Sequence, residues 1–252
     1  MKLPKMILFD YGQTLMAEEE FNRTKGTKAL LEYAIHIPSG VTIKKICDFA
    51  EEMNRVSKRY DRNSDSNMVE IHNHSFMNYL YEYFDIKFDI TPYEREKIFW
   101  DNAAPAKPTR GVEKMLKFLA DNGIRTAVLS NIPYSGHNLK GRIREFLPRN
   151  EFEFIIATSE YVFRKPHPKI FELALRKAKL EPQDVWYIGD KIRNDINGAG
   201  ECGIYPLLYK PYATEQYPEE PRVEYTELKD WSELMRIITE LKQQEVKIFN
   251  EQ

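Results

Sequence analysis

Short apolar runs that end in polar residues are the feature that most limits how this chain can fold. The runs begin with K-M-I-L-F-D and lie at 5–10, 124–130, 152–158, 184–190 and 205–209. Runs this short and this apolar are typical of strands buried on both faces in a parallel sheet. Amphipathic helical patterns lie between them, at 111–123 and 167–178, and the first closes with the helix-ending pair Asn122-Gly123. The alternation predicts an α/β fold with a doubly wound, Rossmann-like parallel sheet.

Residues 17–104 depart from this pattern. They contain helix-period segments, such as T-K-A-L-L-E-Y-A, and no convincing buried strand. We interpret them as a helical insertion that leaves the α/β core after its first strand, so that the core consists of residues 1–16 and 105–252. The chain would return to the core near Pro105 and Pro108, whose surroundings look like a short linker.

Aromatic and amphipathic patterns give two further expectations. Tyr79, Tyr81 and Tyr83 lie in the insertion, and we expect them to belong to its own hydrophobic core rather than to a substrate-binding surface. The segment D-W-S-E-L-M-R-I-I-T-E-L near the end of the chain is amphipathic. It predicts a final helix packed on the sheet.

Composition and charge narrow the classes of partner. The chain is 42% hydrophobic with a formal net charge of -2, so neither a basic nucleic-acid-binding surface nor an acidic tail is indicated. No apolar run approaches the ~20 residues of a membrane-spanning helix, and no secretory signal is visible. Cys47 and Cys202 stand far apart, which favours free thiols over a disulfide framework. We therefore expect a cytoplasmic protein that binds small molecules or proteins, and its oligomeric state is left open.

Polar side chains gather where the predicted strands end. Each of these residues lies at or shortly after the end of a predicted strand. They are Asp10, Ser130, Asn131, Lys165, Asp190 and Asp195. In an open parallel sheet, ligands bind in the crevice at the carboxyl ends of the strands. We therefore expect these side chains to lie on one common rim.

Carboxylates, a hydroxyl and a cation on one rim suit phosphoryl transfer through a covalent aspartyl intermediate. A carboxylate can attack phosphorus when its own charge and that of the phosphate are neutralised, and Mg²⁺ held by oxygen ligands can supply that neutralisation. Lys165 would add a second positive charge, and Ser130 would donate a hydrogen bond to a phosphoryl oxygen. Taken singly, these residues could be turn, helix-cap or exposed surface positions. Their joint order favours a shared site.

Four segments carry a resemblance to a known family. They are I-L-F-D-Y-G-Q-T-L, V-L-S-N, R-K-P-H-P-K-I-F and Y-I-G-D-K-I-R-N-D-I-N-G-A, in this order along the chain. In these segments the chain resembles the haloacid dehalogenase-like hydrolases, a superfamily dominated by Mg²⁺-dependent phosphatases. The resemblance covers residues 5–15 and about 105–210. The helical insertion sits where one subgroup of the family carries a cap domain.

The resemblance implies a nucleophile and a metal site. Asp10 would be the nucleophile and a Mg²⁺ ligand, and the backbone carbonyl of Gly12 would be a further ligand. Asp190 would bind the metal as well. Asp195 would hold the metal directly or through a neighbouring group.

The resemblance also implies how phosphate would be held. Ser130 and Asn131 would bind the phosphate, and Lys165 would orient both the phosphate and the nucleophile. Thr14 would support the loop that follows the first strand.

Gly12 is where the chain departs from the family pattern. Family phosphatases carry a second Asp there, which protonates the leaving alcohol and then activates the hydrolytic water, a contribution worth ~10²- to 10⁴-fold. A phosphatase without it would be slow, selective for good leaving groups, or dependent on an acid–base group from the cap, for which His72 and His74 are candidates. Residues two apart point to different sides of a helix, so we expect two surface histidines instead.

Two other interpretations stay open at this point. The chain could be a non-phosphatase of the same fold, either a dehalogenase, although those show an aromatic residue where Gly12 stands, or a phosphonatase, which would need a Schiff-base lysine such as Lys25 or Lys28. It could also bind phosphate or phosphoproteins without turnover. The intact nucleophile, lysine and metal ligands favour retained chemistry. We therefore expect a Mg²⁺-dependent hydrolase, a phosphatase acting on a small phosphorylated metabolite.

Overall fold

A parallel sheet forms the centre of the molecule. The computed structural model describes residues 1–61, 65–213 and 219–250, and within them six strands pair in the order β10-β9-β8-β1-β6-β7. Every neighbouring pair is parallel. The bounds of the strands are β1 Met6–Phe9, β6 Arg125–Ser130, β7 Ile155–Ala157, β8 Val185–Gly189, β9 Tyr205–Tyr209 and β10 Thr226–Leu228. The predicted α/β fold and parallel sheet are therefore confirmed, with β7 shorter than expected and β10 not foreseen.

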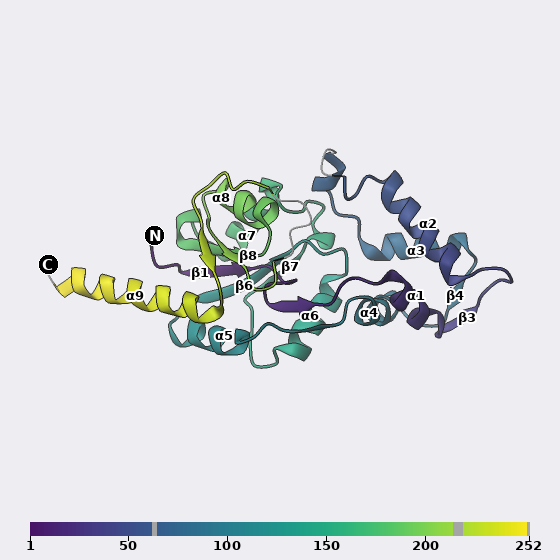
Figure 1. Ribbon diagram of the computed structural model, residues 1–252, viewed down its shortest axis with the longest axis horizontal. Helices are drawn as coiled ribbons and strands as arrows, with labels where there is room; N and C mark the ends of the chain where they lie inside the picture. Colours follow the sequence, from purple (N-terminus) through teal and green to yellow (C-terminus); the bar gives the residue numbers. More distant parts are fainter. Residues whose placement is uncertain (62–64, 214–218, 251–252) are drawn as a thin grey trace.

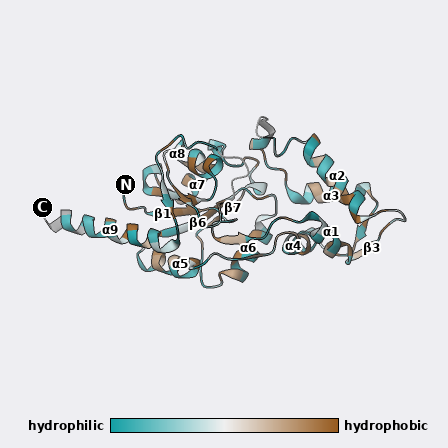
Figure 2. Cartoon of the chain, viewed as in Figure 1, coloured by the Kyte–Doolittle hydropathy of each residue, from teal (hydrophilic) through white to brown (hydrophobic). Residues whose placement is uncertain are grey.

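Helices cover both faces of this sheet (Figure 1). Met6 and Leu8 of β1 pack in one hydrophobic cluster with α7 and α8, whereas Ile7 and Phe9 pack in another with α5, α6 and α9. Successive strand residues point to opposite faces, so two apolar neighbours serve two layers. Figure 2 shows the hydrophobic strands lying between these more hydrophilic helices. The bounds of the helices are α5 Val112–Asp121, α6 Gly136–Phe146, α7 Pro168–Ala178, α8 Gly198–Gly200 and α9 Trp231–Asn250.

Short turns of other helix types connect the core elements. They are the 3-10 turns η2 Thr158–Glu160 and η3 Pro182–Asp184 and the π-helical turn η4 Ile192–Asn197. The predicted final helix is confirmed as α9, and its first residue, Trp231, stacks on Tyr209 of β9 with ring centroids 4.0 Å apart. Among the described residues, no helix is both long enough and apolar enough to cross a membrane.

The helical insertion lies between two short strands, β2 (Met16–Glu18) and β5 (Ala106–Pro108), which pair with each other in antiparallel fashion. The linker expected around Pro108 is therefore wrong, because a strand pairs there instead. A three-residue strand such as A-K-P has no recognisable pattern of its own, and the partner decides its conformation.

Helices make up most of the insertion, which lies beside the sheet in Figure 1. Its elements are α1 Arg23–Leu31, β3 Ala34–His36, α2 Ile43–Val56, η1 Asp65–Met68, α3 Asn73–Tyr83, β4 Lys87–Phe88 and α4 Pro92–Ala103. β3 and β4 form a small antiparallel ribbon, and the residues of both strands are half-buried or exposed. The expectation of helices without a buried strand is confirmed, although this exposed ribbon was not foreseen.

The three tyrosines of α3 do not share one environment. Tyr81 is 1% exposed and belongs to the core, as expected, but Tyr79 and Tyr83 are 59% and 61% exposed, so the expectation is wrong for them. Residues four apart lie on the same face of a helix, while a residue midway between them lies on the opposite face. Tyr79 and Tyr83 instead stack on the ring of Phe49 from α2.

Gly26 allows α1 and α4 to pack closely. A Cβ atom on Gly26 would lie 2.8 Å from both the Cβ of Ala103 and the carbonyl oxygen of Phe99, which is fixed backbone. We predict that Gly26→Ala lowers the free energy of unfolding by about 1–3 kcal/mol, measured by urea denaturation, because the helices must separate.

Gly141 of α6 is the matched control. It also lies in a helix, but no described atom outside the backbone of that helix stands within 4 Å of an added Cβ. Gly141→Ala should therefore raise the stability by about 0.5–1 kcal/mol through the lower chain entropy of alanine. Equal effects of the two substitutions would contradict the close packing of α1 on α4.

Candidate active site

The carboxyl ends of three neighbouring strands hold the candidate site. β1 lies between β6 and β8. After β1 the chain adds β6 and β7 on one side of it and then β8, β9 and β10 on the other side. Such a reversal of strand order opens a crevice at the carboxyl ends of the strands. Asp10, Ser130 and Asp190 follow or end these strands. Each is less than 9% exposed.

Lys165 lies at the centre of the site and is 1% exposed. Its Nζ lies 3.2 Å from Oδ1 of Asp10 and 2.6 Å from Oδ1 of Asp195, and it also donates to the hydroxyl of Tyr187. Burial disfavours the ammonium, but the Asp10 and Asp195 carboxylates outweigh it and raise the pKa of Lys165. The lysine is therefore held charged between two carboxylates.

Tyr187 supports this arrangement from within β8. Its hydroxyl accepts the hydrogen bond from Lys165 and donates to the backbone carbonyl of Leu129 in β6, 2.7 Å away. Burial and the neighbouring carboxylates raise its pKa well above the ordinary value, so it keeps its proton. Its role is not visible in the sequence, because a tyrosine in the apolar run D-V-W-Y-I-G-D resembles any other core residue.

Asp10, Asp190 and Asp195 form a carboxylate cluster, with one oxygen of each within 4.8 Å of the others. Both oxygens of Asp190 are buried and accept no hydrogen bond within the described part of the chain. Burial, together with the charges of Asp195 and Asp10, raises the pKa of Asp190 to about 8, while Lys191 acts in the opposite direction. Crowded carboxylate oxygens, of which the Asp190 pair accepts no hydrogen bond from the described residues, fit a divalent cation, whose charge would reverse this effect on the pKa.

Asp195 differs from the other two members of the cluster because both of its oxygens have protein partners. Its Oδ1 pairs with Lys165, and its Oδ2 accepts from the backbone N–H of Lys191 at 2.9 Å. Gly189 makes room for it, because a Cβ at that position would lie 2.3 Å from the Asp195 carboxyl carbon. Both oxygens of Asp195 thus already have partners, which suits a role in holding Lys165.

Asn131 and Thr14 have structural partners around the site. The Asn131 side chain accepts from the backbone N–H of Lys165 at 2.7 Å and donates to the backbone carbonyl of the same residue at 2.8 Å. It therefore fixes the lysine-bearing loop. Thr14 is fully buried, and its carbonyl accepts from the hydroxyl of Thr109 at 2.9 Å, which ties the first loop to the start of α5.

Glu18 of β2 was not foreseen as part of the site. Its Oε1 accepts from Nε1 of Trp100 at 3.3 Å and lies 3.6 Å from Nη1 of Arg142. Its Oε2 lies 3.0 Å from the position that a Cβ on Gly12 would take. Burial raises the pKa of the Glu18 carboxyl. The charge of Arg142 and the hydrogen bond from Trp100 lower this pKa, whereas the charge of Asp10 raises it further. In the sequence, Glu18 opens the run E-E-E, which resembles a solvated surface.

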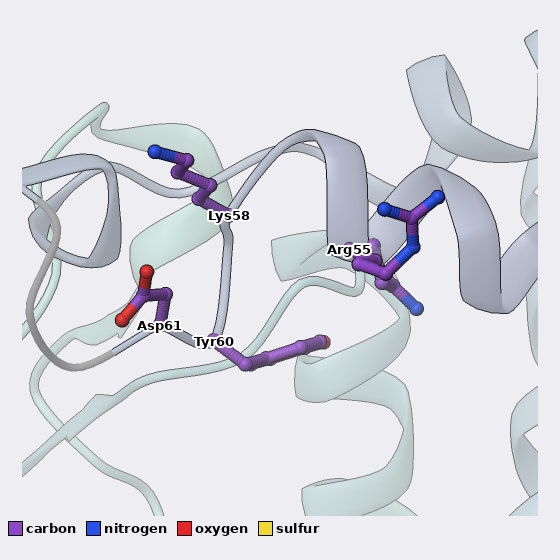
Figure 3. Close-up of a pocket in the computed structure, with 5 residues that line it drawn as sticks. Arg55, Lys58, Tyr60 and Asp61 are labelled. Atoms are coloured by element: carbon purple, nitrogen blue, oxygen red, sulfur yellow. The ribbon is translucent and has the colours of Figure 1, made fainter.

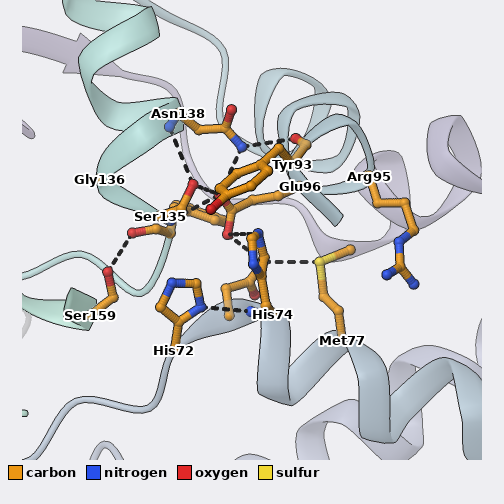
Figure 4. Close-up of polar contacts among 12 residues, drawn as sticks. His72, His74, Met77, Tyr93, Arg95, Glu96, Ser135, Gly136, Asn138 and Ser159 are labelled. Carbon is orange, nitrogen blue, oxygen red and sulfur yellow. Dashed lines mark hydrogen bonds and ion pairs between the residues drawn. The ribbon is translucent and has the colours of Figure 1, made fainter. Parts of the chain in front are cut away.

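His72 and His74 are not two surface histidines on opposite sides of a helix, so that expectation is wrong. His72 caps the N-terminus of α3 instead of lying within it, and the two rings are 4.6 Å apart. His74 lies 3.4 Å from a carboxylate oxygen of the fully buried Glu96. Figure 4 shows His74 and Asn138 converging on Glu96 from α3 and α6.

Glu96 uses these contacts to join the insertion to the core. It accepts from the backbone N–H and the hydroxyl of Ser135, which caps α6, and from the amide of Asn138 at 2.7 Å. Among the described residues, no hydrogen bond or ion pair links His72 or His74 to the carboxylate cluster. Lys25 and Lys28, the candidate Schiff-base lysines, are exposed on α1.

A separate pocket lies on the insertion and is lined by Asn54, Arg55, Lys58, Tyr60 and Asp61. Figure 3 shows its Arg55 and Lys58 side chains pointing in different directions. It shares no residue with the carboxylate cluster.

Comparison with known proteins now decides the family. The family model for the haloacid dehalogenase-like hydrolases matches residues 4–203. The chain belongs to this family. The haloacid dehalogenase-like hydrolase domain-containing protein 3 of Homo sapiens is 32% identical over 39% of the chain and 38% of its own length. The glyceraldehyde 3-phosphate phosphatase of Pyrococcus furiosus is 30% identical over 53% of the chain and 51% of its own length.

The matched part thus spans about half or less of these curated relatives. Solved structures of haloacid dehalogenase-like proteins match over most of their length. A HAD phosphatase from Thermococcus onnurineus is 17% identical with a TM-score of 0.60, covering 94% of this chain and 98% of its own. A 2-haloacid dehalogenase from Pseudomonas syringae is 17% identical with a TM-score of 0.58, and the match covers 94% of this chain and 99% of the dehalogenase. Because a phosphatase and a dehalogenase fit alike, the fold alone does not select the chemistry.

We predict that Tyr187→Phe lowers the free energy of unfolding by about 1–3 kcal/mol, because it leaves Lys165 and the Leu129 carbonyl each short of a buried partner. Urea denaturation measures the change. Tyr205→Phe in the adjacent strand is the control, since its hydroxyl pairs with Thr226 in a partly exposed place and should matter less. Equal losses in the two variants would contradict a special role of Tyr187.

Proposed function

We propose that this chain is a Mg²⁺-dependent phosphatase that hydrolyses the phosphate monoester of a small metabolite through an aspartyl phosphate on Asp10. The observation that carries the proposal is Lys165, buried and charged between Asp10 and Asp195, beside Asp190, whose carboxylate accepts no hydrogen bond from the described residues. A pure structural core would not retain this arrangement, since buried charges are costly. The relative named glyceraldehyde 3-phosphate phosphatase supports phosphate ester chemistry.

The site residues divide the reaction between them. Asp10 attacks phosphorus, and the bond from phosphorus to the ester oxygen breaks. Lys165 neutralises charge on Asp10 and on the incoming phosphoryl group, while Ser130 and the backbone N–H of Asn131 bind phosphoryl oxygens. Attack of water on phosphorus then releases Asp10 and inorganic phosphate.

Asp10, Asp190 and the carbonyl of Gly12 would hold Mg²⁺, with Asp195 acting through Lys165. When bound, the ion neutralises negative charge on the phosphate and on its own carboxylate ligands. The crowding of the carboxylate cluster and the orphan oxygens of Asp190 support a cation at this place.

The insertion, with proposed limits at 17 and 104, would act as a cap that encloses the substrate and selects it. Its segment after η1 reaches the lysine-bearing loop, where the N–H of Glu70 donates to the carbonyl of Val162 at 2.7 Å. The N–H of Asn73 likewise donates to the carbonyl of Pro133, beyond Ser130. Contacts on two site loops suit a cap that excludes water during the reaction.

The cytoplasm is the proposed compartment. The free thiols of Cys47 and Cys202 support it, since a reducing environment keeps such cysteines unpaired.

The deciding experiment compares wild type with Asp10→Asn on p-nitrophenyl phosphate and a panel of phosphorylated metabolites. The variant should lose on the order of 10³-fold or more in kcat, because the nucleophile is gone. Asp121→Asn is the control, since this residue lies exposed on α5 and pairs with Lys117. It should keep wild-type activity.

A metal arm completes this test. Removing divalent ions with a chelator should abolish turnover, and Mg²⁺ should restore it in wild type but much less in Asp190→Asn. Wild type and Asp10→Asn equally inactive on every phosphate, with Mg²⁺ still raising thermal stability, would contradict the phosphatase and favour a binding protein. Borohydride trapping with a phosphonoaldehyde would reveal a phosphonatase by labelling a lysine.

A further inference from the structure

Hydrolysis through an aspartyl phosphate needs a group that gives and takes a proton. The leaving alcohol must receive a proton when its bond to phosphorus breaks, and the attacking water must lose one. Two charged groups beside Asp10 are already engaged. Lys165 is held by two carboxylates and Tyr187, and Asp195 has partners on both oxygens. Gly12, two residues after the nucleophile, has no side chain.

Glu18 places a carboxylate in the space left by Gly12. Its Oε2 lies 3.0 Å from where a Cβ on Gly12 would be, so it occupies the volume into which a side chain at position 12 would extend. Its side chain remains 20% exposed. The carboxylate is therefore close to the nucleophile-bearing turn without being sealed in the core.

The other oxygen of Glu18 is anchored. Oε1 accepts from Trp100 of α4 and faces Arg142 of α6, which is 2% exposed and stacks over the Trp100 ring at 4.2 Å. The backbone carbonyl of Glu18 also accepts from Nε2 of Gln13, beside Gly12. Contacts on Oε1 thus orient the carboxylate so that Oε2 faces the nucleophile-bearing turn. A group that transfers a proton beside Asp10 would need this orientation.

We propose that Glu18 is the general acid and base of this site. The inference rests on the proposed phosphatase function. Protonated Glu18 gives its proton to the ester oxygen as Asp10 attacks phosphorus, which yields the alcohol, the aspartyl phosphate and the Glu18 carboxylate. That carboxylate then takes a proton from the water that attacks phosphorus, so that inorganic phosphate leaves and both Asp10 and protonated Glu18 are restored.

The test uses two phosphates of similar size but different leaving groups, p-nitrophenyl phosphate and benzyl phosphate. Nitrophenolate leaves without a proton, whereas benzyl alkoxide needs one. Glu18→Gln should therefore still release a burst of about one nitrophenolate per site and then turn over ~10²- to 10⁴-fold more slowly, because water is no longer activated. With benzyl phosphate it should show no burst.

Asp101→Asn is the matched control for structure. Asp101 lies 3.4 Å from Nε of the same Arg142 but does not approach Gly12. It should keep the wild-type ratio of rates on the two substrates. Thermal unfolding of both variants checks that they are folded.

A relocation variant separates a chemical role from a structural one. Glu18→Ala should be as slow as Glu18→Gln, and adding Gly12→Asp to it should recover much of the rate, because the space for a side chain at position 12 is then empty. Gly12→Asp alone should impair the enzyme by crowding two carboxylates. A carboxylate on the nucleophile-bearing turn would not replace a purely structural Glu18.

The outcomes distinguish this inference from the function on which it rests. A wild type that hydrolyses neither phosphate contradicts the proposed function and the inference together. An active wild type whose Glu18→Gln variant turns over at the wild-type rate overturns the inference alone. Equal slowing by Asp101→Asn, or loss of the nitrophenolate burst in Glu18→Gln, also overturns it.

Discussion

A lysine buried between carboxylates is the interaction on which the candidate site depends. Lys165 is tied to Asp10 and Asp195 by its ammonium and to Asn131 by its backbone. Removing these three charged groups from water is costly and is tolerated only with close partners and good geometry. One ammonium beside three carboxylates leaves excess negative charge, which favours binding of the proposed divalent cation.

The insertion and the nucleophile-bearing turn are joined by polar contacts rather than by apolar packing alone. Trp100 of α4 and Arg142 of α6 hold Glu18 on β2, and Glu96 of α4 takes hydrogen bonds from Ser135 and Asn138 at the start of α6. A movement of α4 on α6 would change the position of the Glu18 carboxylate. The cap would then control proton transfer as well as access to the site.

The core was predictable because its signals are local. Strands such as M-I-L-F are buried on both faces and read as continuous apolar runs, and positive φ at Gly123 confirms the predicted end of α5. The small ribbons and β10 were not predictable, since strands of two or three residues take their conformation from their partners. The meeting of Asp10, Asp190 and Asp195 followed from the order of strand ends, and the structure brings them together.

The roles of Glu18, Tyr187 and the two histidines can be recognised only from the three-dimensional structure. Glu18 belongs to an acidic run, Tyr187 to an apolar strand, and His72 lies one residue before the helix it was assigned to. Glu18 is held by Trp100 and Arg142, and Tyr187 contacts Lys165. These neighbours are distant in sequence, and no local pattern contains them.

The most direct test of the central claim is to locate the phosphoryl group on the enzyme. Wild type and Glu18→Gln are mixed with p-nitrophenyl phosphate and Mg²⁺, quenched in acid within the first turnover and fragmented for mass spectrometry. The account predicts one added phosphoryl group on the fragment containing Asp10, at higher occupancy in Glu18→Gln because the second step is slowed. A phosphoryl group on any other residue, or none during rapid turnover, would contradict it.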